Sequence, residues 1–394
     1  MRIRPVVASL VLALGSVACS DGDAPRWGGT IDTLATGVVV VRSPAEGLWG
    51  DRPARLVETL RIGSVDGGGP DQFGNVLDVT LDELGRLYVL DAQAREVRVF
   101  GPDGRHVRSF AGRGAGPGEL ERPLGLEWGS SGRLWIVDFG NRRYEVFDTA
   151  GAYVAGHPLP TGSFGFSNGW RSDGFLHERV VEVTEGGRRL TTLRRRLAGD
   201  SLVVEDTLPV PEAPPPPETV EVTVRAGDAT FTDELTIPLA PRSVREQDPA
   251  GRWWISDPGA AYRIAELDLL GDTVRLIERS YEPVPVSDEQ RRSALESVPE
   301  GSELSEDRIP AVHPPIDALL PGRDDIWVKR RTAAERTGYD VFDREGRYLG
   351  ELRADLPLDR FTQMDRRGDT VVGVLLGPLD VPLVVRLEAE LPLR

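Results

Sequence analysis

The sequence predicts an all-β fold in which repeated sheets are arranged radially, as the six blades of a β-propeller. Residues 82–104 and 129–151 carry one pattern twice, at a constant offset of 47 positions. Repeats of about 40–50 residues that contain several strands each are typical of propeller blades. Turn residues are abundant, with 44 glycines and 31 prolines in 394 residues, and helical periodicity is scarce. These observations favour short strands joined by tight turns over any helical architecture.

Each copy of the repeat has the turns and strands of a β-meander. In the first copy, the apolar run 87–90 predicts a strand that ends at Asp91. Val97 and Val99 then alternate with charged residues, as expected of a strand with one buried face. Pro-Asp-Gly at 102–104 predicts a turn, because proline fixes its own φ and glycine accepts a positive one. A third strand follows this turn.

The rest of the chain carries weaker copies, which predict four further blades. These lie near residues 164–208, 248–278, 319–352 and 365–390. The Pro-rich run 209–218 predicts an extended inter-strand loop. Ser287 can cap a helix that runs to about residue 297, and we interpret this helix as a short insertion between strands.

The segment Arg55–Gly63 predicts how the ring closes. The 47-residue register makes this segment the last strand of a blade whose other strands do not precede it. The obvious source of those strands is Phe361–Glu388, at the far end of the chain. We therefore expect the N-terminal strand to complete the C-terminal blade, which would also remove exposed sheet edges.

The N-terminus has the features of an export signal. Residues 1–4 include two arginines, residues 6–14 are apolar, and residues 16–18 are small, as at a signal-peptide cleavage site. The apolar run is too short for a stable membrane span. We therefore expect a signal peptide at 1–18, a tether at 19–34 and the six-bladed propeller at 35–394.

Cys19, the only cysteine, directly follows this cleavage site. The segment resembles the lipobox of exported bacterial lipoproteins, although Ser16 stands where that family usually has leucine. The resemblance implies that Cys19 becomes the lipidated N-terminus, and secretion without a lipid is the alternative. A single cysteine also excludes a disulfide framework within the chain.

The repeats also resemble the NHL-type six-bladed β-propeller family. The residues that carry this resemblance are GPGELERP (116–123), GRLWIVD (132–138), NRRYEVF (141–147) and TAG (149–151). The resemblance implies a fold rather than an activity, because that fold hosts both binding scaffolds and lyases.

Several residues recur at one position of the repeat. Asp91, Asp138 and Asp257 could form a metal site, but a residue repeated in each blade more often serves the blade. We expect each of them to bind its own turn and a nearby arginine such as Arg95 or Arg142.

Equivalent aromatic residues recur as well, and we expect them to pack between neighbouring blades. They are Tyr88, Trp135, Trp254 and Trp327.

Other candidate sites have less support in the sequence. The glycine-rich run 112–118 lacks the spacing and the helix of a phosphate-binding loop. None of the histidines (His106, His157, His177 and His313) has metal-ligand spacing with another. We therefore predict no catalytic, cofactor or metal residues. Arg122 and Arg242 precede first strands of blades, and we predict that they face a ligand at one mouth of the channel.

The net charge of −16 argues against nucleic acid or an anionic membrane surface as a direct partner. The hypothesis is an exported, lipid-anchored monomer at the cell envelope, periplasmic or on the outer surface. It would be a binding or scaffold module for an envelope protein, peptide or glycan, held at the membrane only by the lipid on Cys19. The alternative is a metal-dependent propeller lyase or lactonase that uses the central channel. A non-enzymatic role is favoured, and the question of an enzyme stays open.

Overall fold

A computed structural model describes residues 26–392, and the prediction of an all-β protein is confirmed. Its description leaves out, within that range, 53, 66–67, 130, 164–168, 185–186, 213–216, 227–228, 260, 300–301, 303, 332–336, 355 and 357–360. Cys19 and the expected signal peptide lie outside the described residues. In the described part, no helix is both long enough and apolar enough to span a membrane.

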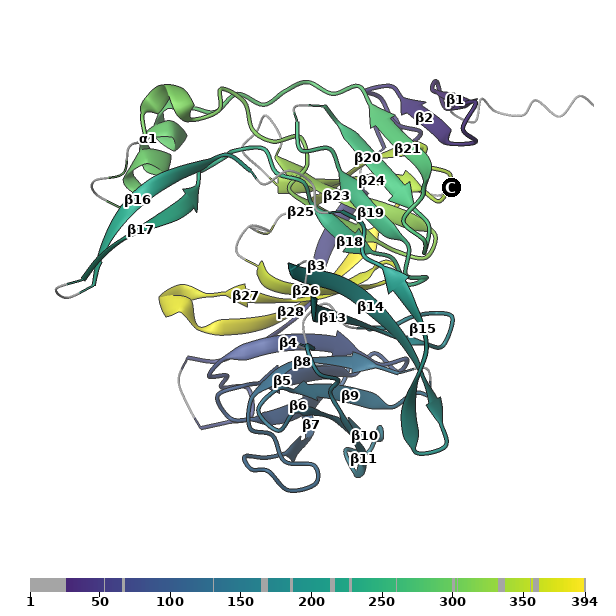
Figure 1. Cartoon of the computed structure of the whole chain (residues 1–394), viewed down its shortest axis with the longest axis vertical. Helices are drawn as coiled ribbons and strands as arrows, with labels where there is room; N and C mark the ends of the chain where they lie inside the picture. The colour runs from purple at the N-terminus through teal and green to yellow at the C-terminus, as the bar shows by residue number, and fades with distance from the viewer. Residues whose placement is uncertain are drawn as a thin grey trace, which may run out of the picture.

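The repeated stretches form two four-stranded antiparallel sheets (Figure 1). The first contains β4 (Val76–Leu81), β5 (Leu87–Asp91), β6 (Glu96–Phe100) and β7 (His106–Ala111). The second contains β8 (Pro123–Trp128), β9 (Leu134–Asp138), β10 (Arg143–Phe147) and β11 (Tyr153–Pro158). The copies also share backbone conformation, since Arg95 and Arg142 have φ values of 59° and 57°.

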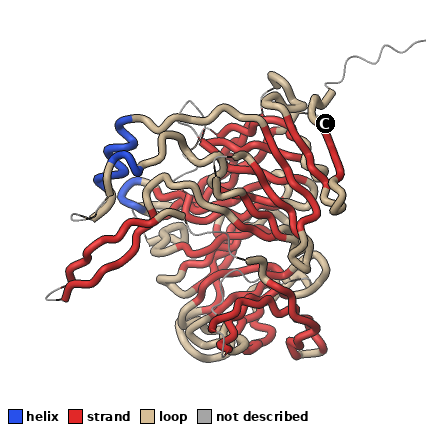
Figure 2. Tube along the Cα trace, turned by 45° about the horizontal axis from the view of Figure 1, so that its top comes forward, coloured by secondary structure: helices blue, strands red, loops and turns tan. Residues whose placement is uncertain are grey.

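The third sheet and a separate hairpin follow in the sequence. The sheet contains β12 (Gly169–Trp170), β13 (Leu176–Thr184), β14 (Gly187–Ala198) and β15 (Ser201–Pro209). The hairpin consists of β16 (Thr219–Ala226) and β17 (Ala229–Thr236). Figures 1 and 2 show this hairpin projecting away from the sheets, beside the helix α1 (Asp288–Glu296).

A six-stranded sheet combines the fourth predicted blade with strands from the N-terminus. Its four consecutive strands are β18 (Arg245–Gln247), β19 (Trp253–Ser256), β20 (Arg263–Leu267) and β21 (Thr273–Arg279). β2 (Val39–Ser43) pairs in parallel with β21, and β1 (Thr30–Thr33) pairs with β2. We expected residues 19–34 to be a tether, but the end of this segment forms the strand β1.

The last sheet has eight strands and joins the two ends of the chain. One half contains β22 (Ala318–Pro321), β23 (Asp325–Arg331), β24 (Thr337–Asp343) and β25 (Tyr348–Ala354). The other half contains β26 (Phe361–Arg367), β27 (Thr370–Leu376) and β28 (Pro382–Glu390). Between the halves lies β3 (Ala54–Ile62), parallel to β25 and antiparallel to β28. The predicted pairing of the N-terminal strand with the C-terminal strands is present.

Apolar side chains fill the spaces between successive sheets. Tyr88 of β5 meets Trp128 of β8 edge-on, with ring centroids 4.9 Å apart. Trp135 of β9 contacts Trp170 of β12 at 5.0 Å, and the ring of Trp327 lies 3.7 Å from the guanidinium of Arg366. Trp254 is buried in a cluster that includes residues of β22 to β25. The predicted packing of the recurring aromatic residues between sheets is confirmed.

The insertion that contains the helix has its own small core. Val220 and Val222 of the hairpin are buried with Ala294 of α1 and Ile309, which follows the 3-10 helix η1 (Glu306–Arg308). Ser287 caps α1 in a capping box with Gln290, as its sequence position predicts. A second short 3-10 helix, η3 (Pro378–Asp380), lies between β27 and β28.

In each group of strands that are consecutive in the sequence, the first strand lies at one end of its sheet. Several of these first strands contact one another. The first strands are β4, β8, β12, β18, β22 and β26. β4 contacts both β8 and β26, β8 contacts β12, and β18 contacts β22. The carboxyl ends of these strands consequently gather around one region of the molecule.

Candidate functional site

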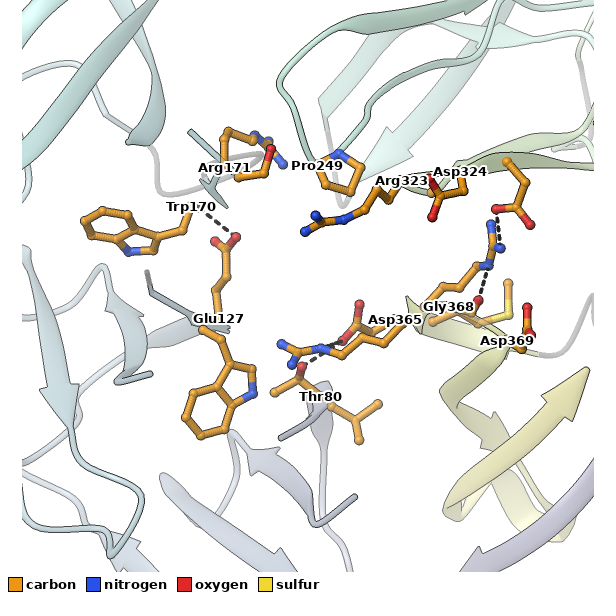
Figure 3. Close-up of a pocket in the computed structure, with 18 of the residues that line it drawn as sticks. Thr80, Glu127, Trp170, Arg171, Pro249, Arg323, Asp324, Asp365, Gly368 and Asp369 are labelled. Atoms are coloured by element: carbon orange, nitrogen blue, oxygen red, sulfur yellow. Dashed lines mark hydrogen bonds and ion pairs between the residues drawn. The ribbon is translucent and has the colours of Figure 1, made fainter. Parts of the chain in front are cut away.

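A cavity of about 1050 Å³ lies at the carboxyl ends of the first strands (Figure 3). Residues on or just after all of these strands line it, from Asp78–Thr80 on β4 to Met364–Asp369 at the end of β26. Charged side chains of both signs, two indole rings and short turns make up the wall. A cavity of this size can hold a small molecule or a short stretch of a polymer.

Two carboxyl groups connect neighbouring first strands at the cavity wall. Asp78 Oδ2 accepts a hydrogen bond of 2.9 Å from Leu126 N on β8, and Asp78 Oδ1 accepts from Val79 N. Glu127 Oε1 accepts one of 2.7 Å from Trp170 N on β12. Each carboxyl thus satisfies a backbone donor at the open edge of the next sheet.

Glycines on the receiving strands make room for these carboxyl groups. A Cβ at Gly125 would lie 3.1 Å from Asp78 Oδ2, and one at Gly169 would lie 2.8 Å from Glu127 Oε1. A larger residue at position 169 would displace the carboxyl group of Glu127. The glycines therefore help to fix the position of both acids.

Burial is the main cause of the raised pKa values of Asp78 and Glu127. It raises the pKa of Asp78 to about 7, and the nearby Asp365 adds to this effect. Burial likewise raises the pKa of Glu127 to about 8, with smaller contributions from Asp365 and Asp78. Arg171 and the N–H of Trp170 act in the opposite direction on Glu127 but are outweighed. Near neutral pH, Glu127 therefore holds a proton and can donate a hydrogen bond.

Asp365 is the third acid at the cavity. Its Oδ2 accepts a hydrogen bond of 2.7 Å from the hydroxyl of Thr80. Arg367 Nε lies 3.9 Å from the same oxygen. Figure 3 shows Glu127, Arg323 and Asp365 pointing toward the same open space. Donors and acceptors of a bound ligand would both find partners there.

Arginines supply the positive charge of the wall. Arg171 follows β12, and its Nη2 donates to Gln247 Oε1 at 3.0 Å. Arg323 lies in the exposed turn between β22 and β23. Arg366, by contrast, is occupied within the fold, because it pairs with Asp325 at 2.5 Å and donates to two backbone carbonyls.

The recurring aspartates are structural, as the sequence suggested, but their partners differ in part. Asp91 accepts from its own turn at Gln93 N and pairs with Arg98 at 3.3 Å, so the expectation of Arg95 is wrong. Asp138 accepts from the side chain of Asn141, through Nδ2, instead of from an arginine side chain.

The third aspartate and the two expected arginines complete this comparison. Asp257 binds Gly259 N and lies 3.8 Å from Arg263. Arg95 pairs with Glu121, and Arg142 donates to the carbonyls of Ser163 and Pro160. Arg95 and Arg142, which have positive φ values, therefore use their side chains for partners other than Asp91 and Asp138, the aspartates of their own turns.

Arg122 and Arg242 are exposed and do not line the cavity. Arg122 directly precedes β8, whereas the cavity lies at the other end of that strand, and its guanidinium stacks over Phe139 at 5.2 Å. Arg242 likewise precedes β18. Their ligand-facing role stays a prediction, and the structure places them at the opposite ends of their strands from this cavity.

The remaining candidate motifs are occupied within the fold. In the glycine-rich run, Gly116 N donates to Glu119 Oε2, an acid of the same loop. His106 bonds to Ser109, His157 stacks on Trp135, and His313 bonds to Gln290. His177 is buried, and burial lowers its pKa to about 4. Among the described residues, no group of three or more His, Cys, Asp or Glu side chains could hold a metal ion.

The residues that line the cavity are not among those predicted from the sequence. A usable signal is present, since Asp78 and Glu127 each interrupt an otherwise apolar first strand, in VLDVTL and PLGLEW. Arg171 and Arg323 lie in turns, where arginine carries no distinguishing pattern. Only the three-dimensional arrangement brings these four residues to one cavity.

No family model and no curated protein matches the sequence. Solved structures with a similar fold include a proposed exported protein of Bacteroides fragilis, with 12% identity over 89% of this chain and 100% of that chain, and a TM-score of 0.49. Virginiamycin B lyase from Staphylococcus aureus has 11% identity over 85% and 99%, with a TM-score of 0.41. Regucalcin, a calcium-binding protein from Agrobacterium tumefaciens, has 12% identity over 90% and 97%, with a TM-score of 0.36. At these values the similarity assigns no activity to this chain.

Proposed function

We propose that the chain is an exported binding module, a six-bladed β-propeller that holds a polar ligand in its central cavity. Six sets of strands would form the blades, with β3 completing the blade of β26 to β28 and closing the ring. The mature protein would begin at Cys19, carry a lipid there and act at the cell envelope as a monomer. The export signal and the single cysteine after it support this placement.

The observation that carries the proposal is the composition of the cavity wall. Carboxyl groups, guanidinium groups and the indole rings of Trp128 and Trp170 surround a space of about 1050 Å³. Polar groups that fix orientation and aromatic faces that bury apolar surface are the usual ingredients of a ligand site. A peptide or a glycan combines hydroxyl, amide and apolar surfaces that such a wall can bind.

Blocking the cavity tests the proposal. Asp324→Trp places a large ring at an exposed turn of the wall, and Ala150→Trp places the same ring at an exposed turn remote from the cavity. Both variants and the wild-type protein would be applied to arrays of envelope peptides and glycans. We expect Ala150→Trp to retain binding and Asp324→Trp to lose at least tenfold in affinity, because the new ring fills space that the ligand needs. Equal binding by both variants would contradict the proposal.

The intact mass of protein purified from membranes tests the anchor. An N-terminus at Cys19 with added acyl mass is expected, and the same N-terminus without that mass would contradict lipidation. A Cys19→Ser variant that remains in the membrane fraction would also contradict it.

A further inference from the structure

Two arginines at the cavity, Arg171 and Arg323, form no ion pair with a carboxylate among the described residues. Within the described residues, the guanidinium of Arg171 has a single hydrogen bond, to the neutral Gln247. Arg323 has neither a hydrogen bond nor an ion pair in that part of the chain. Both guanidinium groups lie at the wall of the same cavity.

Glu127, whose carboxyl group lies beside Arg171, is not a full counterion for it near neutral pH, because burial raises its pKa to about 8. Glu127 accepts a hydrogen bond from Trp170 N, beside Arg171, and burial keeps its carboxyl group protonated. Asp78 and Asp365 are the other charged groups that act on Glu127, and both raise its pKa further. A protonated carboxyl group beside a guanidinium offers an incoming anion two kinds of donor.

Glu246 of β18 and His177 of β13 also act electrostatically with Arg171. Burial raises the pKa of Glu246, although Arg179 and Arg171 oppose that shift. His177 is neutral in this environment, because burial and the charge of Arg171 both lower its pKa.

We propose that the wall formed by Arg171, Arg323 and Glu127 is an anion subsite that binds a carboxylate or phosphate group of the ligand. This inference rests on the proposed function, because it specifies the chemistry of the ligand in the same cavity. The other carboxyl groups of the wall would face the uncharged or cationic part of that ligand, except for Asp325, which is paired with Arg366. They belong to Asp78, Asp324, Asp325, Asp365 and Asp369. The ligand is thus a saccharide or peptide that carries a carboxylate or phosphate group.

Isothermal titration of the purified protein with small anions tests this subsite without knowledge of the natural ligand. Citrate serves as the carboxylate probe and inorganic phosphate as the phosphate probe, each measured at pH 6.5 and pH 9. We expect at least one of them to bind at pH 6.5, about tenfold more weakly in Arg171→Gln and in Arg323→Gln, because each substitution removes a charge-assisted hydrogen bond. The tighter of the two probes identifies the group that the subsite prefers.

The matched control is Arg105→Gln, which removes a highly exposed arginine on an outer turn and should leave the affinity unchanged. Binding should weaken at pH 9, where Glu127 becomes negative beside Arg171, and Glu127→Gln should retain more of its affinity at that pH. Circular dichroism and melting curves show that each variant is folded.

The outcomes separate this inference from the proposed function. Failure of both probes to bind, or equal binding by Arg171→Gln, Arg323→Gln and the wild-type protein, would overturn the anion subsite. The array experiment with Asp324→Trp would still report whether the cavity binds a ligand. Binding of an uncharged glycan that Asp324→Trp abolishes and Arg171→Gln leaves unchanged would support the module and contradict the subsite.

Discussion

Asp78 and Glu127 combine a structural and a chemical role at the same positions. Each accepts a backbone hydrogen bond from the next sheet, and each lies at the cavity. The structural contact needs only an acceptor oxygen, whereas the raised pKa values place a titration within the physiological range. These two roles can be separated by replacing the acid with its amide.

Glu127→Gln should change how stability depends on pH. The folded protein raises the pKa of Glu127 from 4.5 to about 8, so the folded state binds a proton that the unfolded state has lost. That contribution is fully present below pH 4.5, falls by about 1.4 kcal/mol per pH unit, and is lost by about pH 8. The amide side chain of the variant keeps an acceptor for Trp170 N without this titration.

The measurement is urea unfolding of both proteins between pH 5 and pH 9. The free energy of unfolding of the variant, relative to wild type, should rise by about 4 kcal/mol over this range. Glu83→Gln, at an exposed turn, is the control and should follow the wild type. A constant difference between Glu127→Gln and the wild type would show that the acid is not protonated in the folded state.

Asp138 should contribute to stability rather than to binding. It is fully buried and accepts hydrogen bonds from Glu121 N, Arg122 N, Gly140 N and Asn141 Nδ2. Asp138→Ala leaves these donors without a partner and should cost about 3 kcal/mol of the free energy of unfolding. Asp257→Ala, at a more exposed position with fewer partners, should cost less than about 1 kcal/mol in the same urea titration. Equal losses would contradict this assignment.

At the scale of elements, the sequence predicts best where a pattern is repeated. The strands β5 to β7 and β9 to β11 follow from the two copies, because turn residues and alternating apolar residues recur at a fixed offset. The helix α1 follows from its capping residues. The pairing of β3 with β28 follows from the same register, since a blade that lacks its inner strands must find them elsewhere in the chain.

Other elements do not follow from local patterns. The hairpin β16–β17 is not predicted, although Val220, Val222 and Val224 alternate with polar residues, because the Pro-rich run before it suggests a continuing loop. The sequence of β1, TIDT, suggests a tether because it is polar, and the strand is fully exposed and gains its pairing only from β2. In both cases a partner strand, not the local sequence, decides the structure.

The cap of α1 gives a prediction at this scale. Ser287→Ala removes the hydroxyl that accepts from Gln290 N and should lower the free energy of unfolding by about 1 kcal/mol. Ser305→Ala is the matched control, because Ser305 begins η1 without a side-chain cap and its loss should be nearly neutral. Thermal unfolding of the two variants distinguishes them. A larger loss for Ser305→Ala would contradict the role of the capping box.

At the scale of the whole molecule, β3 joins the first and last parts of the chain. It is hydrogen-bonded to β25 on one side and to β28 on the other, so displacing β3 would expose the edges of two sets of strands. The cavity depends on this closure, because its wall includes both the early strands β4 and β8 and the late strand β26.

A disulfide between β3 and β28 tests the closure. Val57 and Glu388 are directly paired, so Val57→Cys with Glu388→Cys, in a Cys19→Ser background, should form a bridge under mild oxidation. Because the bridge closes a very long loop, it should stabilise the protein by about 5 kcal/mol in the chain-entropy account. Val57→Cys with Glu390→Cys, out of register, is the control and should not cross-link. Equal cross-linking of both pairs would contradict the register.

The most direct measurement is a crystal structure of the protein with citrate or phosphate, whichever binds more tightly in solution. The account predicts six sets of strands around one central cavity, with the anion between Arg171 and Arg323 and within hydrogen-bond distance of Glu127. A different number of sheets, or an anion bound at Arg122 or Arg242 while the cavity contains only water, would contradict it.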